Sequence, residues 1–287
     1  MLRQKWTIGS DPEIFLEDTS GSFVSAFDGL AKGYLYGTKA IPEKTKYGAI
    51  QVAGMAVELN TLPTDNPQAF YNMIEDGIAD ACVRFGKAVP SKASIKHFDS
   101  GWMLGQHPAA IELGCDPDYN AWEQGEPNPR PDVMKPCRTA GGHVHIGWRD
   151  PSLPFGAADM QAHLAECCEV IQHFDYVLGV WSVPMDPGGK ERRAMYGTAG
   201  AFRPKDYGVE YRVLSNFWVF NKAHAESVIK RSLAGMNAYA DGVLFQKIFG
   251  DEAVRILKGT SQHMYPVWNE VNNILRPYLE EIENAAA

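Results

Sequence analysis

Apolar and polar residues alternate along several stretches of the chain with the two-residue period of a β-strand. Such stretches cover residues 6–17, 48–60, 141–147 and 207–214, and a turn at 18–21 returns the first of them on itself. Short turns join antiparallel strands, whereas parallel strands need long crossovers. The pattern therefore predicts hairpins rather than βαβ units over residues 5–60.

Five other stretches place apolar residues on one helical face. We expect an N-cap at Asn221, a helix end at Gly259 and a kink at Pro277. Strands followed by helices indicate an α+β fold, which we expect to be one domain over 1–287 with a strand-rich core at about 5–220 and C-terminal helices at 221–287. The predicted helices are Pro67 to Phe85, Met160 to Leu178, Asn221 to Met236, Asp251 to Leu257 and His263 to Asn284.

Two segments show neither the two-residue period of a strand nor the spacing of a helical face, and we expect both to be irregular. The proline-rich segment from Cys115 to Cys137 is long for a loop inside a compact domain, which favours a functional role such as a lid. The segment from Asp186 to Asp206 combines glycines with lysines and arginines. It is either a solvated surface loop or a loop that grips an anion.

Composition narrows the class of protein. The 287 residues are 45% hydrophobic and 22% charged, as in a soluble globular protein, and the net charge of −8 argues against binding to duplex nucleic acid or an anionic membrane. The chain has neither a signal-peptide core nor an apolar run of membrane length, so we expect a cytoplasmic protein. Its odd number of cysteines, five, favours reduced thiols.

The sequence Gly-Gly-His-Val-His-Ile-Gly at 141–147 is the first candidate site. The strand period puts His143 and His145 on one face, where imidazoles could bind a metal, a nucleotide or both. The alternative is a pair of core histidines with ordinary hydrogen-bond partners. Cys137 lies six residues before His143, so a Cys/His zinc site is a further interpretation.

Carboxylates occur on the other predicted strands. Asp11 and Glu13 are two residues apart on one face, and Glu58 points away from the apolar side of its strand. Glu210 and Arg212 likewise share a face. Each pattern alone also fits a solvated acid or a surface ion pair. Together with the histidines and the basic segment, they supply ligands for more than one divalent cation and positive charge for a transferred phosphate.

This order of motifs resembles the glutamine synthetase and glutamate-cysteine ligase superfamily of ATP-dependent carboxylate-amine ligases. Within it, the chain resembles the phage phiEco32-like COOH.NH2 ligase type 2 family. The similarity extends to about Asn216, and the C-terminal helices match no motif that we identify. The matching stretches are GSDPEIFL (9–16), VELN (57–60), ELGCDPDYNAW (112–122), TAGGHVHIG (139–147) and YGTAGAFRPKDYGVEYRVLSN (196–216).

The resemblance implies a curved, mainly antiparallel sheet with helices packed on one face, as in the glutamine synthetase catalytic domain. It implies ATP and two or more Mg²⁺ ions as cofactors, with Mn²⁺ as an alternative. The implied metal ligands are Asp11, Glu13, Glu58, His143 and Glu210. The expected nucleotide contacts are His145, Arg203, Lys205 and Arg193, and the expected catalytic residues are Arg203, Arg212 and Glu210.

The implied reaction joins a small-molecule or peptide carboxylate to an amine through an acyl phosphate, in the host cytoplasm if the gene belongs to a phage. Relatives of this kind often form homo-oligomers. One departure is that Gln51, Ala53 and Gly54 stand where relatives carry more acids. Two rival hypotheses are a ligase fold that binds nucleotide without turnover, and a zinc hydrolase built on Cys137, His143 and His145.

Overall fold

The computed structural model describes residues 5–30, 41–111, 118–130, 135–152 and 157–286. Their strands form two six-stranded sheets and a separate ribbon, and the paired strands are antiparallel throughout these ranges. The first sheet has the order β1-β12-β14-β13-β9-β10. Its strands are β1 (Thr7–Ser10), β12 (Val144–Gly147), β14 (Gly208–Tyr211), β13 (Ala201–Lys205), β9 (Tyr119–Asn120) and β10 (Glu126–Pro127).

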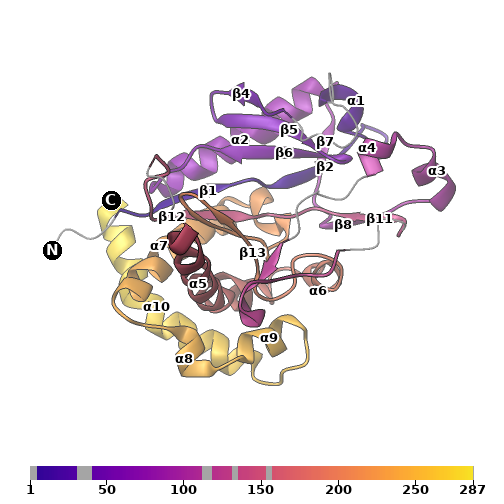
Figure 1. The fold of residues 1–287 in the computed structure, drawn as a ribbon. Coiled ribbons are helices and arrows are strands. Elements are labelled where there is room, and N and C mark those ends of the chain that lie inside the picture. The colour runs from indigo at the N-terminus through magenta and orange to yellow at the C-terminus, as the bar shows by residue number, and fades with distance from the viewer. Residues whose placement is uncertain (1–4, 31–40, 112–117, 131–134, 153–156, 287) are drawn as a thin grey trace.

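The second sheet has the order β3-β2-β6-β5-β4, and β7 also pairs with β2. Figure 1 shows this sheet above the first, with helix α2 along it. Its strands are β2 (Glu13–Glu17), β3 (Phe23–Val24), β4 (Glu43–Thr45), β5 (Gly48–Ala53), β6 (Ala56–Thr61) and β7 (Val89–Ser91), and the ribbon pairs β8 (Ile95–His97) with β11 (Cys137–Thr139).

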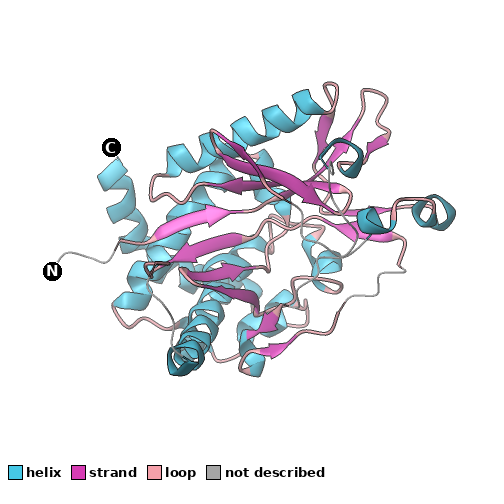
Figure 2. Ribbon diagram, turned by 45° about the horizontal axis from the view of Figure 1, so that its top comes forward, coloured by secondary structure: helices cyan, strands magenta, loops and turns pink. Residues whose placement is uncertain are grey.

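Four long helices cover the sheets, and shorter ones connect the elements (Figure 2). The long helices are α2 (Pro67–Arg84), α5 (Ala157–Phe174), α7 (Lys222–Ala240) and α10 (Met264–Ala286). The short ones are α1 (Phe27–Leu30), α3 (Ser100–Leu104), α4 (Pro108–Ile111), α6 (Gly189–Arg193), α8 (Phe245–Phe249) and α9 (Glu252–Leu257), with the 3₁₀ turns η1 (Ala121–Glu123) and η3 (Asn216–Phe220) and the π-helical segment η2 (Asp175–Val180). Among the described residues, no helix has both the length and the apolar composition to cross a bilayer.

The first sheet has one apolar face and one polar face because its strands alternate. Val144 and Ile146 of β12 and Val209 of β14 are fully buried in the core that the sheet shares with the C-terminal helices. Burying each such side chain stabilises the fold by about 1.5–3 kcal/mol. The residues between them, such as His145 and Glu210, therefore lie on the other face. The helices cover one side of the sheet and leave the other side for polar groups.

The expected α+β fold with a curved antiparallel sheet is confirmed. Helix α7 begins as predicted, because Oδ1 of Asn221 accepts a hydrogen bond from the His224 N–H at 3.1 Å. Met160, which was expected on the buried face of its helix, is instead 52% exposed. The unpredicted short helix α8 precedes α9.

The prediction that both low-periodicity segments are irregular was wrong in part. The segment Asp186 to Asp206 contains helix α6 and strand β13. Its basic composition was misleading, because the Arg192 guanidinium is fully buried and donates a hydrogen bond to the Val213 carbonyl at 2.9 Å. In the segment Cys115 to Cys137, β9 and β10 extend the first sheet, while Cys115 and the rest of 112–117 and 131–134 lie outside the described residues.

Candidate functional site

The polar face of the first sheet carries a row of chemically active side chains on three adjacent strands. His145 of β12 stands directly opposite Glu210 of β14, and Glu210 stands directly opposite Arg203 of β13. Opposite residues in antiparallel strands have Cβ atoms about 4.5–5.5 Å apart, so the register itself brings these groups together. The row joins motifs that are more than sixty residues apart in the sequence.

Asp11 reaches this row from the point where the chain passes from one sheet to the other. Strand β1 pairs with β12 in the first sheet, and β2 pairs with β6 in the second, so Asp11 lies in the break between them. One carboxylate oxygen is 3.1 Å from Nε2 of His145, and the other is 3.3 Å from Nδ1 of His143. We call Asp11, His143, His145 and Glu210 the histidine–carboxylate cluster.

Glu210 is fully buried and surrounded by cations. Its Oε2 lies 2.7 Å from Nζ of Lys205 and 3.7 Å from Nη1 of Arg203, and its Oε1 accepts a hydrogen bond from Nη1 of Arg212. Nδ1 of His143 is 3.5 Å from Oε1. A carboxylate can be buried only when charge and hydrogen bonds compensate its lost hydration. Glu210 therefore contacts both the rest of the histidine–carboxylate cluster, through His143, and the basic side chains beside it.

The residue types and positions in the cluster fit a divalent cation. Asp11, His145 and Glu210 each offer one ligand atom, and the three atoms lie within 4.8 Å of one another. Nε2 of His143 is buried and has no polar partner among the described residues. Oδ1 of Asp11, Nε2 of His145 and Oε2 of Glu210 are also buried, and each has an ion-pair contact in place of a hydrogen bond. Buried polar atoms normally form hydrogen bonds, so these atoms are candidates for binding a cation.

A second row of side chains crosses the second sheet beside the cluster. Glu58 of β6 stands opposite Glu13 of β2 on one side and Gln51 of β5 on the other. The Gln51 amide donates a hydrogen bond to Glu58, and the Gly141 N–H donates one to Glu13 at 2.6 Å. Burial, together with the charges of Asp11 and Glu13, raises the pKa of Glu58 to about 8. A cation would relieve this repulsion.

Burial and local charge shift the pKa values of the neighbouring acids and histidines in different directions. Burial raises the pKa of Glu13, as it raises that of Glu58. Burial acts to raise the pKa of Asp11, but its contacts with His145 and His143, hydrogen bonds included, outweigh burial and hold the pKa well below its ordinary value. Burial and then the positive charge of Arg212 lower the pKa of His143 to about 3, so its ring is neutral and able to act as a ligand.

The space beside Gly141 and Gly142, which precede the histidines, is occupied by other groups of the protein. A Cβ at Gly141 would collide with the His143 ring, and one at Gly142 would collide with the Ser215 carbonyl and the Trp218 indole. At Gly142 the missing side chain allows another backbone segment, at Ser215, to approach closely. At Gly141 the space is filled by a side chain of the cluster.

Three contacting residues were not singled out from the sequence. The Tyr207 hydroxyl hydrogen-bonds Nδ1 of His145, which leaves Nε2 to face Asp11. The Tyr196 hydroxyl accepts from Nη2 of Arg212, and Asp118 lies 3.8 Å from Nε of the same guanidinium. Both tyrosines lie in the motif at 196–216. The sequence signal that could have identified them is their position, since Tyr196 lies within the basic segment 186–206 and Tyr207 directly follows it.

The structure does not bring every expected residue to this place. Arg193 is the last residue of helix α6. Its guanidinium donates a hydrogen bond to the Leu257 carbonyl at 3.2 Å and lies 4.0 Å from Asp186. Sγ of Cys137 contacts the sulfur of Met195 at 3.7 Å. The metal-ligand group found among the described residues therefore consists of two acids and a histidine, rather than the Cys/His set of a zinc hydrolase.

A comparison with known families bears on the chemistry of this face. The model of the family phage phiEco32-like COOH.NH2 ligase-type 2 matches residues 138–283, about half of the chain. The match includes His143, His145, Arg203, Glu210 and Arg212. It also covers most of the C-terminal helices, in which we identified no motif from the sequence, and it does not include Asp11 or the acids of the second sheet.

A search of curated proteins gives no match to the chain. The residues that the family model matches include His145, Glu210 and Arg203, which stand opposite one another on the polar face of the first sheet. The chain belongs to the phage phiEco32-like COOH.NH2 ligase-type 2 family of carboxylate–amine ligases.

Proposed function

We propose that the protein is an ATP-dependent ligase that joins a carboxylate to an amine through an acyl phosphate. One observation carries this proposal: metal-ligand groups and phosphate-binding cations share the single carboxylate of Glu210. Lys205, Arg203 and Arg212 all approach Glu210, while Asp11 and His145 face it from the other side. Phosphoryl transfer needs this combination, because charge on the transferred group must be neutralised where the carboxylate attacks.

Asp11, His145 and Glu210 are the residues that would hold Mg²⁺, or Mn²⁺ in its place, with Glu13 and Glu58 beside them. Bound cations would offset the negative charge of the ATP phosphates. We assign His143 to the same metal shell, because its Nδ1 lies near both Asp11 and Glu210. His145 belongs to the same group of possible metal ligands, and this supports a metal contact for it in addition to the expected contact with nucleotide phosphate.

The chain's residues position the reactants. An oxygen of the substrate carboxylate attacks the γ-phosphorus of ATP, the bond to the β–γ bridging oxygen breaks, and ADP leaves. Arg203 and Lys205 lie where they can stabilise the charge on the transferred group. The amine then attacks the acyl carbon, phosphate leaves, the nitrogen loses a proton and an amide remains. No nucleophile from the protein is required.

The proposed partners are a small-molecule or peptide carboxylate and an amine. The net charge of −8 supports small substrates rather than duplex nucleic acid.

The test is Mg²⁺-dependent release of ADP across a panel of carboxylates paired with amines, with bound metal measured on the same samples. Glu210→Gln should lower the rate on the order of 10³-fold, because it removes a charge shared by cation ligands and arginines. Glu280→Gln on the exposed part of α10 is the matched control and should keep the wild-type rate. Wild-type rates in Glu210→Gln would refute the proposal.

A second candidate, a nucleotide-binding protein without turnover, is favoured by Gln51. Its amide hydrogen-bonds Glu58 at a position where a further acid could serve as a metal ligand. This candidate predicts saturable Mg²⁺–ATP binding without substrate-stimulated release of ADP. Gln51→Glu should then strengthen Mg²⁺ binding, which isothermal titration calorimetry measures directly.

A further inference from the structure

A cavity of about 410 Å³ lies on the other side of Arg212 from the histidine–carboxylate cluster. Tyr196 and Asp118 line it, and both contact the Arg212 guanidinium, whose remaining nitrogen bonds Glu210. Tyr196, Asp118 and, behind them, Arg212 thus lie between the cavity and the proposed site of phosphoryl transfer. The volume falls in the range of roughly 300–1,000 Å³ that is usual for small-molecule sites.

The cavity and Lys205, one of the proposed phosphate-binding cations, lie at opposite ends of the β13–β14 hairpin. Lys205 and Tyr207 are at its turn, whereas the cavity borders Ala199, just before β13, and Tyr196, whose hydroxyl contacts Arg212 just after β14. Glu210 and Arg203 stand opposite each other between these ends. A nucleotide held by Lys205 and His145 would therefore leave the cavity free for one of the other two reactants, the acid or the amine.

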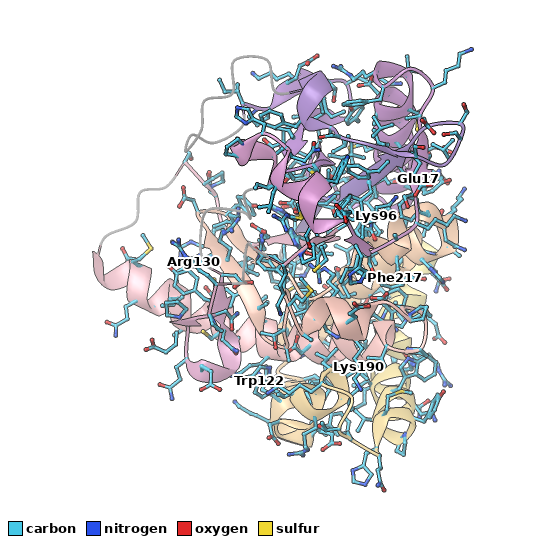
Figure 3. All side chains as sticks on the ribbon, turned by 90° about the vertical axis from the view of Figure 1, so that its right-hand side faces the viewer. Glu17, Lys96, Trp122, Arg130, Lys190 and Phe217 are labelled. Atoms are coloured by element: carbon cyan, nitrogen blue, oxygen red, sulfur yellow. The ribbon has the colours of Figure 1, made fainter. Side chains whose placement is uncertain are left out.

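The charge of the cavity wall is positive. Lys190 of α6 and Lys258, just after α9, line the cavity, and neither forms an ion pair within the described parts of the chain. The two lysines belong to one wall, since a Cβ at Gly259 would lie 2.9 Å from Nζ of Lys190. Figure 3 labels Lys190 in the lower half of its view.

The other charged groups of the cavity already have partners. Asp118 faces Arg212, and Arg193 donates to the Leu257 carbonyl. The amides of Asn120 and Asn128 hydrogen-bond each other at 3.2 Å and fix the wall that contains β9. The two lysine ammonium groups are therefore the charges available to a bound molecule.

We propose that this cavity binds the acid substrate, and that this acid carries a second anionic group on the side remote from its reacting carboxylate. The reacting carboxylate lies at the end of the cavity where Tyr196 and Asp118 contact Arg212, and the second anionic group lies against Lys190 and Lys258. The size of the cavity suits an acid of about dipeptide size. This inference rests on the proposed ligase function and adds the class of acid to it.

The test compares probes that carry or lack a second anionic group. N-succinylglycine carries two carboxylates, its C-terminal amide carries one, and N-succinyl-aminomethylphosphonate replaces the second carboxylate with a phosphonate. Isothermal titration calorimetry measures the binding of each, with and without Mg²⁺ and a non-hydrolysable ATP analogue. This measurement needs no turnover. We expect both dianions to bind about tenfold more tightly than the amide at low salt, and the difference to shrink as salt is added.

The double variant Lys190→Gln/Lys258→Gln should lose this difference while binding the amide as the wild type does. Lys44→Gln/Lys247→Gln removes two exposed charges elsewhere and should keep the difference. A preference for the phosphonate over the dicarboxylate would identify the second group as a phosphate-type anion, and the reverse would identify it as a carboxylate; either supports the proposal.

Three results would overturn it: equal affinity for dianion and amide, no saturable binding of either dianion, or weaker binding of the ATP analogue in the lysine double variant. The last result would assign the cavity to the nucleotide. If the double variant abolishes the preference but no acid stimulates release of ADP, the ligase function fails and the anion site stands. If ADP is released with monoacids and dianions alike, the ligase function stands and the anion site fails.

Discussion

Asp175 allows a quantitative test of the buried electrostatics beneath the site. It is fully buried at the start of η2 and accepts hydrogen bonds from Nε1 of Trp122 at 2.7 Å and from the Tyr211 hydroxyl at 2.9 Å. Burial outweighs these donors and raises the pKa of Asp175 from 3.8 to about 7. The folded protein therefore keeps this proton at pH values where the unfolded chain has lost it.

The sign and size of the effect follow from proton linkage. A raised carboxyl pKa gives stability that is complete below the unfolded value and is lost as pH rises through the folded value. For Asp175 the window runs from about pH 4 to about pH 7, and the total loss is about 4 kcal/mol, from a shift of about three units. Between pH 5 and pH 8 the loss is ~2.5 kcal/mol.

The assay measures the free energy of unfolding in urea at several pH values for the wild type and for Asp175→Asn. The variant cannot titrate at this position, so the free energy of the wild type minus that of the variant should fall by ~2.5 kcal/mol from pH 5 to pH 8. Taking the difference cancels the titration of distant groups. Asp65→Asn, at an exposed position, is the control and should give a constant difference. A constant difference for Asp175→Asn as well would show that Asp175 is not protonated in the folded protein at pH 5.

Three further predictions concern the site and its support. Arg203→Ala should lower kcat on the order of 10²-fold, because it removes a cation beside the transferred phosphate; an unchanged kcat with a raised KM would assign Arg203 to ground-state binding. Tyr207→Phe should weaken Mg²⁺ affinity about 10–100-fold, because Nδ1 of His145 loses its partner, and calorimetry that finds wild-type affinity would contradict this role. Gly197→Ala should destabilise the fold by about 1–3 kcal/mol in urea unfolding, because its φ is +76° and a Cβ would lie 2.7 Å from the Arg212 carbonyl. Gly242→Ala, at φ +83° with open space around it, should cost less.

The predictions that held depended on local periodicity. His145 and Glu210 share the polar face because alternation along a strand fixes which way each side chain points. Alternation also explains why Val144 and Ile146 lie in the core, where both are fully buried. Asn221 was recognised as an N-cap because its side chain acts within one turn of the helix.

The features that the sequence did not predict depend on distant pairings. The pattern of residues does not say that His145 pairs with Glu210 rather than with a neighbour two residues away, because register depends on the whole sheet. It also placed Asp11 and Glu13 on one strand, whereas the chain changes sheets between them. Arg193 was assigned to the nucleotide because composition does not distinguish an arginine bonded to carbonyls from one that faces a ligand.

The change of sheet at Asp11 also has a consequence for cooperativity. The two sheets contribute to two separate hydrophobic cores, one containing Ile8 and Ile146 and the other Ile14 and Val57. Asp11 lies where the chain passes between them, with the acids of the second sheet beside the cluster. A cation bound by residues from both sides would be lost when either core opened, so binding would raise the cost of local opening in each core and couple their unfolding. Amide hydrogen exchange in Ile14 and Ile146 should then slow together as Mg²⁺ is added.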